Sequence, residues 1–320
     1  MDGSLTRYFL QRILLLPVTL ISVVTVAFFV LRILPSDAAL MQLAGESVVR
    51  DEDVLALRQK IGLDKPLIEQ YGTWLGNAVR LDFGNSFRTN RPISEDIARR
   101  FPMTLQLVVM VVLISTALAI PAGVIAAVNQ NKWIDQALRL ISIAGLAIPS
   151  FWLGLMIIIG LVLFFGWSQP LTWARLWEDP AANLQAMIWP ALAVGFRQVA
   201  VNMRMTRATM LDVIREDYVR TARAKGLANG VVIVRHALRN ALLPVVTLIG
   251  FEFATLFSGL IIVETVFNVP GIGRYLIQGI FSRDYPVVQA VVVLIAIIVM
   301  FSNLLVDLLY GWLDPRIRAA

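Results

Sequence analysis

Apart from Arg32, Arg139 and Asp307 near the ends of long apolar stretches, three ionisable residues lie deeper in such stretches or toward their outer side, where a charge is costly unless it has a function or a partner. They are Arg197, Glu252 and Glu264. Arg197 could line a water-filled path and bind a substrate carboxylate, or it could form a structural ion pair with Glu252 or with another subunit. Glu252 could form an interhelical hydrogen bond or line the same path. The residues alone leave these alternatives open.

The residues needed for most enzymatic chemistry are missing from the sequence. The chain has no cysteine and a single histidine, His236, which excludes a thiolate metal site, a cysteine nucleophile and a site with several histidine ligands. It contains no phosphate loop of the form G-x-x-x-x-G-K followed by Ser or Thr, and no H-E-x-x-H motif. Three intramembrane charges also make a poor proton relay, although one coupling carboxylate could suffice. We therefore expect neither a catalytic residue nor a bound metal.

The composition is that of a membrane protein. Of the 320 residues, 58% are hydrophobic and 16% are charged, whereas soluble domains have about a quarter charged residues. A bilayer core of about 30 Å needs about 20 apolar residues per helix. Stretches of this kind occur at 10–33, 104–128, 137–165, 187–203, 243–267 and 287–309. The sequence therefore predicts an all-α integral membrane protein with six transmembrane helices.

The positions of Lys and Arg predict how these helices are oriented. Arg7 and Arg12 at the start of the first apolar stretch, with no cleavage site after it, predict a retained anchor and a cytoplasmic N-terminus. Segment 204–242 is rich in Arg, while the short connections on the opposite side have few basic residues, as the positive-inside rule requires. Topology thus accounts for the net charge of +6 without a nucleic-acid partner. Both termini are expected in the cytoplasm.

The long connection after the first apolar stretch is expected to fold as a helical cap on the outer face. Apolar residues follow helical spacing at 54–61 and 66–79, and Ser94 with the acids after it is typical of a helix N-cap. The predicted divisions are a tail with the first transmembrane helix (1–34), this extracytoplasmic loop (35–103) and a five-helix core (104–320) that contains the cytoplasmic loop 204–242. Asp37 and Asp284 are expected to be exposed on the outer face, either as docking carboxylates or simply as solvated acids.

The cytoplasmic loop contains a short helix with well-marked ends. Residues 218–225 form about two turns, with Glu216 and Asp217 before them and Arg223 and Lys225 at their end. The helix dipole favours acids at the start and bases at the end.

Gly226 is placed to end this helix, and a second helical run follows at 231–242. Ala222 and Ala224 are small enough to allow another chain to approach closely. The helix could therefore dock into a groove of a partner, or it could belong to a solvated basic loop that only fixes topology.

The run EDYVRTARAKG from Glu216 to Gly226, followed after a gap by Leu243-Pro244, resembles the EAA signature of ABC importer permeases. Its form is that of the dipeptide, oligopeptide and nickel class. Further matches to this class are Leu34-Pro35 with Asp37, GLDKPL at 62–67, DFGNS at 82–86, VETVF at 263–267, PGIG at 270–273, RDYP at 283–286 and DPR at 314–316. The resemblance covers nearly the whole chain, and it is specific for the permease class rather than for a substrate. The sequence departs from the class at 36–38, where Ser-Asp-Ala replaces Gly-Asp-Pro.

The resemblance implies a type I ABC importer of a bacterial inner membrane. Two six-helix permease subunits, commonly different chains, line a shared path and rest on two ATP-binding subunits that hold ATP and Mg. An extracytoplasmic binding protein delivers the substrate. In this class the signature helix inserts into a cleft of the ATPase and passes its movement to the transmembrane helices. The residues that the resemblance assigns to this contact are Glu216, Tyr218, Arg220, Thr221, Ala222, Arg223, Lys225, Gly226 and Leu227.

The resemblance also assigns a role to the outer end of the fifth predicted transmembrane helix. Glu264 and the following Pro270, Gly271 and Gly273 belong to a stretch that implies an outward re-entrant loop near the binding protein. An outer gate or a binding-protein contact is expected there, with a simple turn as the alternative.

We therefore expect a permease subunit that performs no bond chemistry, with di- and oligopeptides as the first candidate substrates. Nickel chelates, opines and glycosides are alternatives within the family. An ion-coupled secondary carrier that acts alone, and a membrane scaffold that recruits a cytosolic protein through 218–225, are alternatives from other classes.

Overall fold

The computed structural model describes residues 3–33, 64–170 and 172–313. Within these ranges all regular structure is helical, apart from one isolated bridge between Asn85 and Pro92. The helices in chain order are α1 (Gly3–Ile33), α4 (Leu67–Val79), α5 (Ile93–Val128), α6 (Trp133–Ala147), α7 (Ser150–Phe165), α8 (Pro180–Ile214), α9 (Asp217–Ala224), α10 (Asn229–Val231), the π-helix η1 (Val232–Ala237), α11 (Leu238–Gly259), α12 (Ile261–Val266), α13 (Ile272–Phe281) and α14 (Tyr285–Leu313).

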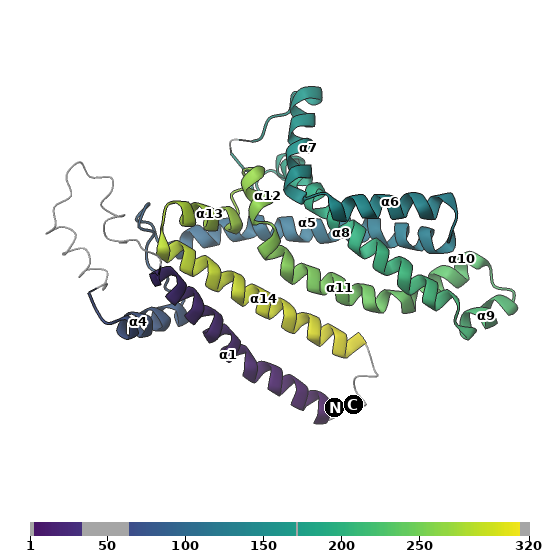
Figure 1. The fold of residues 1–320 in the computed structure, drawn as a ribbon, viewed down its shortest axis with the longest axis horizontal. Coiled ribbons are helices and arrows are strands. Elements are labelled where there is room, and N and C mark those ends of the chain that lie inside the picture. The colour runs from purple at the N-terminus through teal and green to yellow at the C-terminus, as the bar shows by residue number, and fades with distance from the viewer. Residues whose placement is uncertain (1–2, 34–63, 171, 314–320) are drawn as a thin grey trace.

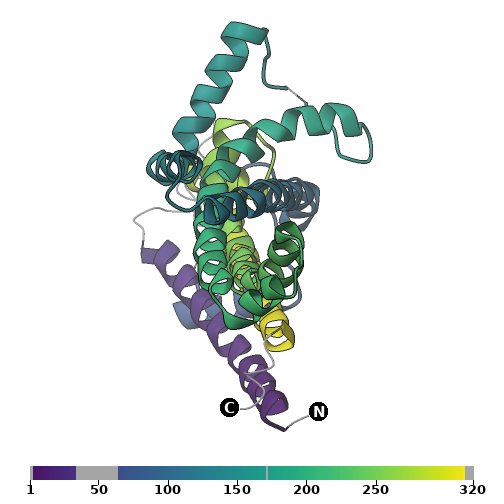
Figure 2. The ribbon, with the colours of Figure 1, turned by 90° about the vertical axis from the view of Figure 1, so that its right-hand side faces the viewer.

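The long helices form an elongated bundle with a different set of short helices at each end. In Figure 1, α5, α8, α11 and α14 run along the molecule, with α9 and α10 at one end and α4 and α13 at the other. α1 packs against α14 and lies at the edge of the bundle when the molecule is viewed from its right-hand side (Figure 2). The predicted cytoplasmic and outer short helices therefore lie at opposite ends of the same bundle.

Membrane-spanning length is reached by four of the described helices: Ile93–Val128, Pro180–Ile214, Asn229–Gly259 and Tyr285–Val306. α6 and α7 together make a fifth candidate. The described apolar part of α1, Leu14–Val30, is shorter than the others. The prediction of an all-helical membrane protein is confirmed, while the count of six transmembrane helices stays a prediction.

The predicted single helix at 137–165 is two helices. α6 and α7 are bent by 101° at the break between them, where Ile148 has extended dihedral angles (φ −84°, ψ 122°) and precedes Pro149. Proline disfavours the α conformation in the residue before it and has no N–H to donate. Hydropathy does not register this break because the residues on both sides are apolar.

Other predicted boundaries were also too narrow. α8 is a helix of 35 residues that continues to Ile214, so the first part of the predicted loop 204–242 is an extension of a transmembrane helix. The predicted run 231–242 joins α10, η1 and α11 in one helical stretch, which ends at Gly259. Hydropathy marks only the part of a helix that lies in hydrocarbon, whereas the helix itself extends into polar sequence.

The outer loop agrees in part with its prediction. α4 confirms the helix expected at 66–79, and the helix expected at 54–61 lies outside the described residues. The expected N-cap at Ser94 is wrong, because α5 starts at Ile93 after Pro92. The fixed φ of proline and its missing N–H suit a helix start.

α5 and α6 pack very closely on α8 because glycines face it. A Cβ added at Gly123 of α5 would lie 2.6 Å from Cβ of Thr206 and 2.8 Å from the carbonyl oxygen of Met203. A Cβ added at Gly145 of α6 would lie 2.8 Å from Cβ of Ala200. Small residues commonly allow such approach between helices in membranes.

We expect Gly123→Ala to lower the melting temperature of the purified protein, because the added methyl overpacks the α5–α8 contact by about 1–3 kcal/mol. Gly160→Ala in α7 is the matched control, since no atom lies within 4 Å of its added Cβ. That control should keep or raise the melting temperature, because alanine suits a helix better than glycine. Equal melting temperatures for the two variants would contradict the close contact.

Candidate functional site

α9 stands at one end of the bundle and has the ends that its sequence predicts. It spans Asp217–Ala224, with Asp217 in the first turn, Arg223 in the last turn and Lys225 as the C-cap residue. Gly226 has φ +79°, in the left-handed region that glycine adopts most readily. The predicted short helix and its glycine stop are therefore confirmed.

One face of α9 packs against its own chain. Val219 is fully buried and Ala222 is 6% exposed, and both belong to one buried cluster with Val232 of η1, against which the partly buried Val213 of α8 packs. The small side chain of Ala222, expected at a partner contact, points inward here. Its size therefore lets α9 lie close to η1.

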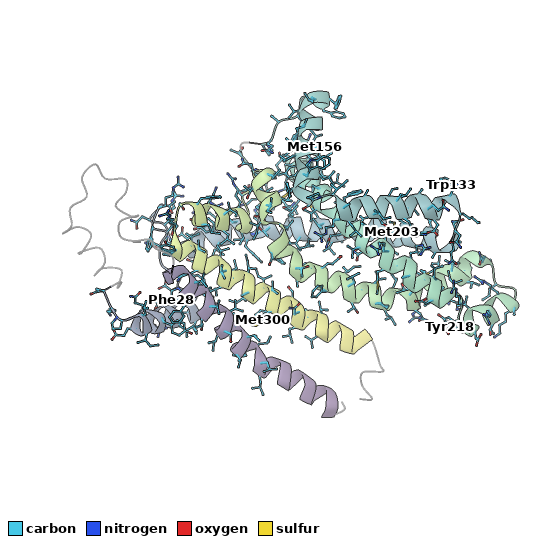
Figure 3. The ribbon with its side chains drawn as sticks, viewed as in Figure 1. Phe28, Trp133, Met156, Met203, Tyr218 and Met300 are labelled. Atoms are coloured by element: carbon cyan, nitrogen blue, oxygen red, sulfur yellow. The ribbon has the colours of Figure 1, made fainter. Side chains whose placement is uncertain are left out.

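Tyr218 fastens α9 to the next helix. Its hydroxyl oxygen accepts a hydrogen bond of 2.8 Å from Nδ2 of Asn240 in α11 and lies 3.5 Å from the carbonyl oxygen of His236 in η1. The ring remains 41% exposed, at the end of the molecule labelled in Figure 3. Tyr218 can therefore contact a partner while it holds α9 in place.

The outer face of α9 and the turn after it form a continuous exposed surface, here called the coupling surface. Apart from the inward Ala222, every residue expected at the partner contact belongs to it: Glu216, Tyr218, Arg220, Thr221, Arg223, Lys225, Gly226 and Leu227. Arg220 forms an exposed ion pair of 3.3 Å with Asp217, which adds little stability. The surface is thus polar and accessible.

The intramembrane charges Arg197 and Glu252 have different surroundings. Glu252 of α11 is 6% exposed and accepts a 2.8 Å hydrogen bond from Nδ2 of the fully buried Asn202 in α8. Arg197 is exposed on α8 and belongs to none of the ion pairs found among the described residues. The structure therefore gives Glu252 the interhelical hydrogen bond and leaves the side chain of Arg197 exposed, within electrostatic range of Glu252.

Glu264 is fully buried in α12 (Ile261–Val266), a helix that lies far from α9, toward the other end of the molecule (Figure 1). Its Oε1 accepts a hydrogen bond of 2.6 Å from the hydroxyl of Thr104 in α5, and its Oε2 accepts one of 3.0 Å from the backbone N–H of Arg274. The Thr104 hydroxyl oxygen in turn accepts a 2.8 Å bond from the N–H of Ile272. Glu264 and Thr104 thus hold the first turn of α13 on α5.

The two glycines of the PGIG stretch make room for this carboxylate. A Cβ added at Gly271 would lie 2.3 Å from Oε1 of Glu264, and one added at Gly273 would lie 2.7 Å from Cα of Ile261. Of the four residues expected at an outer gate or binding-protein contact, Glu264, Gly271 and Gly273 are buried and Pro270 is partly exposed. The stretch is therefore a packed joint in this structure.

Tyr275 and the charged residues around it extend this packed region. Burial and the nearby Asp96 raise the pKa of Tyr275, whose hydroxyl lies 3.2 Å from Oδ2 of Asp96. Arg100 lies over the Tyr275 ring at 4.4 Å, a cation–π contact. Burial and the charge of Arg100 lower the pKa of Arg274. The N-terminal part of α5 is therefore joined to α13 by several polar contacts.

The expected exposure of Asp284 is wrong, because this side chain is 3% exposed. Its Oδ2 accepts a 2.6 Å hydrogen bond from the hydroxyl of Ser86, and its Oδ1 accepts one of 3.1 Å from the N–H of Phe87. The DFGNS and RDYP motifs, which are far apart in the sequence, thus bind each other. Only their separate resemblance to one family marked them in the sequence.

A buried ion pair between α6 and α8 was missed by the sequence reasoning. Asp135, in the first turn of α6, has no exposed surface. Its two carboxylate oxygens accept bonds of 2.6 and 2.7 Å from Nε and Nη2 of Arg207. Arg207 belongs to the basic segment 204–242, whose charges the positive-inside rule alone explains. No local pattern links two residues that lie 72 positions apart.

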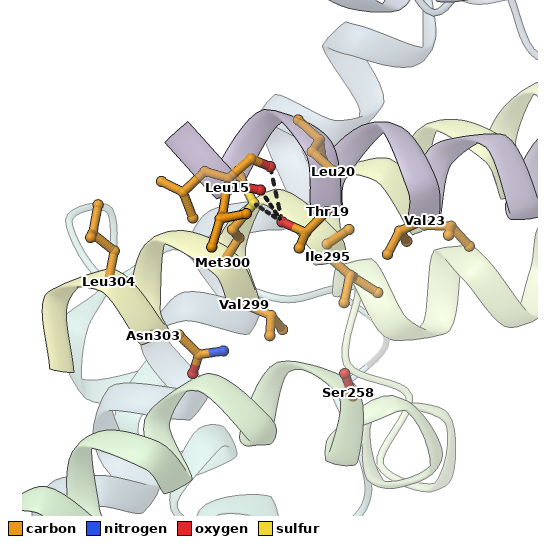
Figure 4. Close-up of a pocket in the computed structure, with 13 residues that line it drawn as sticks. Leu15, Thr19, Leu20, Val23, Ser258, Ile295, Val299, Met300, Asn303 and Leu304 are labelled. Carbon is orange, nitrogen blue, oxygen red and sulfur yellow. Dashed lines mark hydrogen bonds between the residues drawn. The ribbon is translucent and has the colours of Figure 1, made fainter. Parts of the chain in front are cut away.

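An apolar groove of about 620 Å³ lies between α1, α11 and α14 (Figure 4). Its lining contains no ionisable side chain, and its Thr19 hydroxyl bonds to the carbonyl of Leu16 in the same helix and lies 3.6 Å from Sδ of Met300. Such a lining does not suit charged peptide termini. No cluster of three metal-ligating side chains occurs among the residues that the structure describes.

Comparisons with known proteins give one consistent result. The family model described as "Binding-protein-dependent transport system inner membrane component" matches residues 119–319, and a model of the N-terminal part of such membrane components matches residues 5–108. The dipeptide transport system permease protein DppB of Escherichia coli K12 is 39% identical over 335 residues and covers 98% of each chain. The glutathione transport system permease protein GsiC of Escherichia coli K12 is 40% identical over 313 residues, with 98% of this chain and 99% of that protein covered.

A solved structure extends the likeness to the fold. The crystal structure of an amino acid ABC transporter with histidines matches with a TM-score of 0.53 and 17% identity, over 68% of this chain and 94% of that chain.

We expect Thr104→Val to lower the free energy of unfolding by about 1–3 kcal/mol, because Glu264 and the N–H of Ile272 both lose a buried partner. Thr116→Val on the same helix is the matched control, since its buried hydroxyl has no hydrogen-bond partner in the structure. It should be neutral or slightly stabilising. Thermal unfolding of both purified variants measures the difference, and an equal effect would refute the anchoring of α13 by Thr104.

Proposed function

Since the chain belongs to the family of binding-protein-dependent transport system inner membrane components, we propose that it is the permease subunit of an ATP-driven importer of short peptides. The family match and the two relatives support this proposal. Dipeptides and glutathione, named as the substrates of those relatives, are both short peptides. Nickel chelates, opines and glycosides remain alternative substrates of the same class.

The observation that carries the proposal is the coupling surface. α9 exposes polar residues away from the bundle, while Val219 and Ala222 pack it against α8 and η1. α8 continues from this end through the bundle as a single helix of 35 residues. A displacement of α9 would therefore be passed to transmembrane helices instead of being lost in a flexible loop.

The remaining parts of the importer would come from other chains. Two separate ATP-binding subunits would hold ATP and Mg, one of them bound to the coupling surface of this chain. A second permease, commonly an unlike chain, would complete the translocation path, and an extracytoplasmic protein would deliver the peptide. With α1 counted, this chain would cross the bacterial inner membrane six times and keep both termini in the cytoplasm.

The two ends of the bundle would have different tasks in this scheme. α12 and α13 lie opposite α9 (Figure 1) and are fastened to α5 through Glu264 and Thr104, which supports a role as part of an outer gate or binding-protein contact. Arg197, exposed on α8, would face the path or the second permease.

Single cysteines test the coupling surface, because the natural chain has none. We expect Thr221→Cys, on the exposed side of α9, to crosslink to the ATPase in native membranes. Phe281→Cys is the control, since Phe281 is 83% exposed at the end of α13. Failure of Thr221→Cys and of every other position along α9 to capture an ATPase would contradict the proposal.

Gly226 provides a second test through its left-handed backbone. We expect Gly226→Val to reduce ATP-driven dipeptide uptake by the reconstituted importer about tenfold, because this φ costs a bulky residue about 1–2 kcal/mol. Gly226→Asn should retain most of the uptake, since asparagine tolerates this region. Uptake by the lone chain in liposomes, driven by an ion gradient, would support the secondary carrier instead.

A further inference from the structure

The Asp135–Arg207 ion pair has no part in the coupling surface, yet it differs from the other ion pairs found between described residues. The Asp135 side chain is fully buried and that of Arg207 is 21% exposed, whereas both partners of each other pair are at least 43% exposed. A buried carboxylate needs hydrogen bonds to all of its oxygens to offset the loss of water. This pair meets that requirement with a bidentate contact, the strongest geometry for Arg and a carboxylate.

The carboxylate joins three segments of the chain. Besides the two bonds from Arg207, Oδ2 accepts a 3.0 Å hydrogen bond from the N–H of Asn131, in the turn between α5 and α6. Asn131 has φ +63°, a conformation that asparagine tolerates better than most residues. Asp135 also lies in the first turn of α6, where the helix dipole favours an acid. The end of α5, the start of α6 and α8 therefore meet at one side chain.

This junction lies close to the coupling surface. Arg207 precedes the end of α8 at Ile214 by two turns, about 10 Å along the helix, and α9 starts at Asp217. The same part of α8 contacts α5, because Gly123 packs against Met203 and Thr206. α5 and α6 thus both contact α8 shortly before α9 begins.

α6 is held on α8 at a second point and leads toward the outer end. Gly145 packs against Ala200, so α6 runs antiparallel to α8 between two contacts. Beyond the bend at Pro149, α6 is followed by α7, in which Gly154 packs against the ring of Phe267 with 2.8 Å between its added Cβ and Cε2. Phe267 directly follows α12, the helix that contains Glu264. α6 and α7 therefore connect the part of α8 that lies near α9 to α12, the helix that Glu264 and Thr104 link to α5.

We propose that Asp135 and Arg207 are positioning residues that make α6 and α8 move as one body when α9 is displaced. The Gly145 contact holds α6 close to α8 without a directional bond, whereas the bidentate pair adds directional bonds that fix the axial register of the two helices. Without the pair, α8 moves and α6 lags behind, so that less of the movement reaches α7 and α12. This proposal rests on the proposed function.

Spin-label distances test the common movement in the complete importer, expressed with its partner subunits and placed in lipid nanodiscs. Labels at Leu140 of α6 and Leu184 of α8, both exposed, report the distance between the two helices. We expect this distance to stay within about 2 Å between the nucleotide-free and ATP-trapped states. In Asp135→Asn the mean label distance should change by more than about 2 Å between the two states, or the distribution of distances should broaden.

Uptake per ATP hydrolysed provides the second readout, because loss of stability alone lowers both quantities together. We expect Asp135→Asn and Arg207→Gln each to reduce dipeptide uptake per ATP about tenfold, and the double variant to lose no more than either single one, as residues of one contact do. Uptake per ATP by Arg207→Lys should lie between the values of the wild type and of Arg207→Gln, since lysine keeps the charge but cannot form the bidentate contact. Arg204→Gln is the matched control: it removes the same charge from an exposed position of α8.

The outcomes separate this proposal from the proposed function. Variants that lose uptake and hydrolysis in equal proportion, or a wild-type label distance that changes by several ångströms between the two states, would overturn the positioning role and leave the permease assignment intact. A wild-type importer that shows no ATP-driven uptake would overturn the proposed function, and the positioning role with it.

Discussion

Contact between helices at backbone distance is the constraint on which this structure depends. In lipid, apolar side chains gain little by leaving the hydrocarbon, so helices associate mainly through close packing and hydrogen bonds. Gly123 and Gly145 allow α5 and α6 to reach the backbone and Cβ atoms of α8, and no side chain separates them there. α8 thereby becomes the helix against which its neighbours are set, and it is also the helix that leads directly into α9. The position of the coupling surface relative to the bundle follows from this packing.

Buried acids hold the segments that helix packing alone cannot place. Asp135, Glu264 and Asp284 each accept at least one backbone N–H from a turn or a helix start, and each also binds a side chain of another element. Backbone groups at helix ends have no partner within their own helix and must find one when water is excluded. A carboxylate satisfies this need with two oxygens, and at the same time it joins two elements. The irregular parts of the chain are therefore fixed by charges at the ends of the bundle, whereas its middle is fixed by shape.

The sequence was informative where the signal is local. Apolar length predicted the helical membrane class, and the acids, bases and glycine around 217–226 predicted α9 within one residue at each end. The sequence was uninformative where a helix changes direction, because the bend at Ile148-Pro149 lies between two apolar runs. It was also uninformative where a hydrogen-bond partner is distant in sequence, since Thr104 and Glu264 are 160 residues apart. Asp284 looked like a surface acid because nothing near it in sequence reveals Ser86, which lies 198 positions away. Sequence patterns report what a residue prefers, while burial of a charge depends on which other segment folds against it.

The inward position of Ala222 changes how the signature helix should be understood. A contact motif is expected to place its most distinctive residue against the partner, yet Ala222 is buried in a cluster with the chain's own Val219 and Val232. Its size then limits how near α9 lies to η1, and in the proposed importer recognition of the partner would fall to the exposed residues of the coupling surface. The same packing and the Tyr218–Asn240 bond attach α9 to the stretch that becomes α11, in addition to its short link to α8. α8 and α11 are joined again by the Asn202–Glu252 hydrogen bond. A force applied to α9 therefore acts on two long helices that are connected to each other, which makes a rigid response of the pair easier than a separate movement of either one.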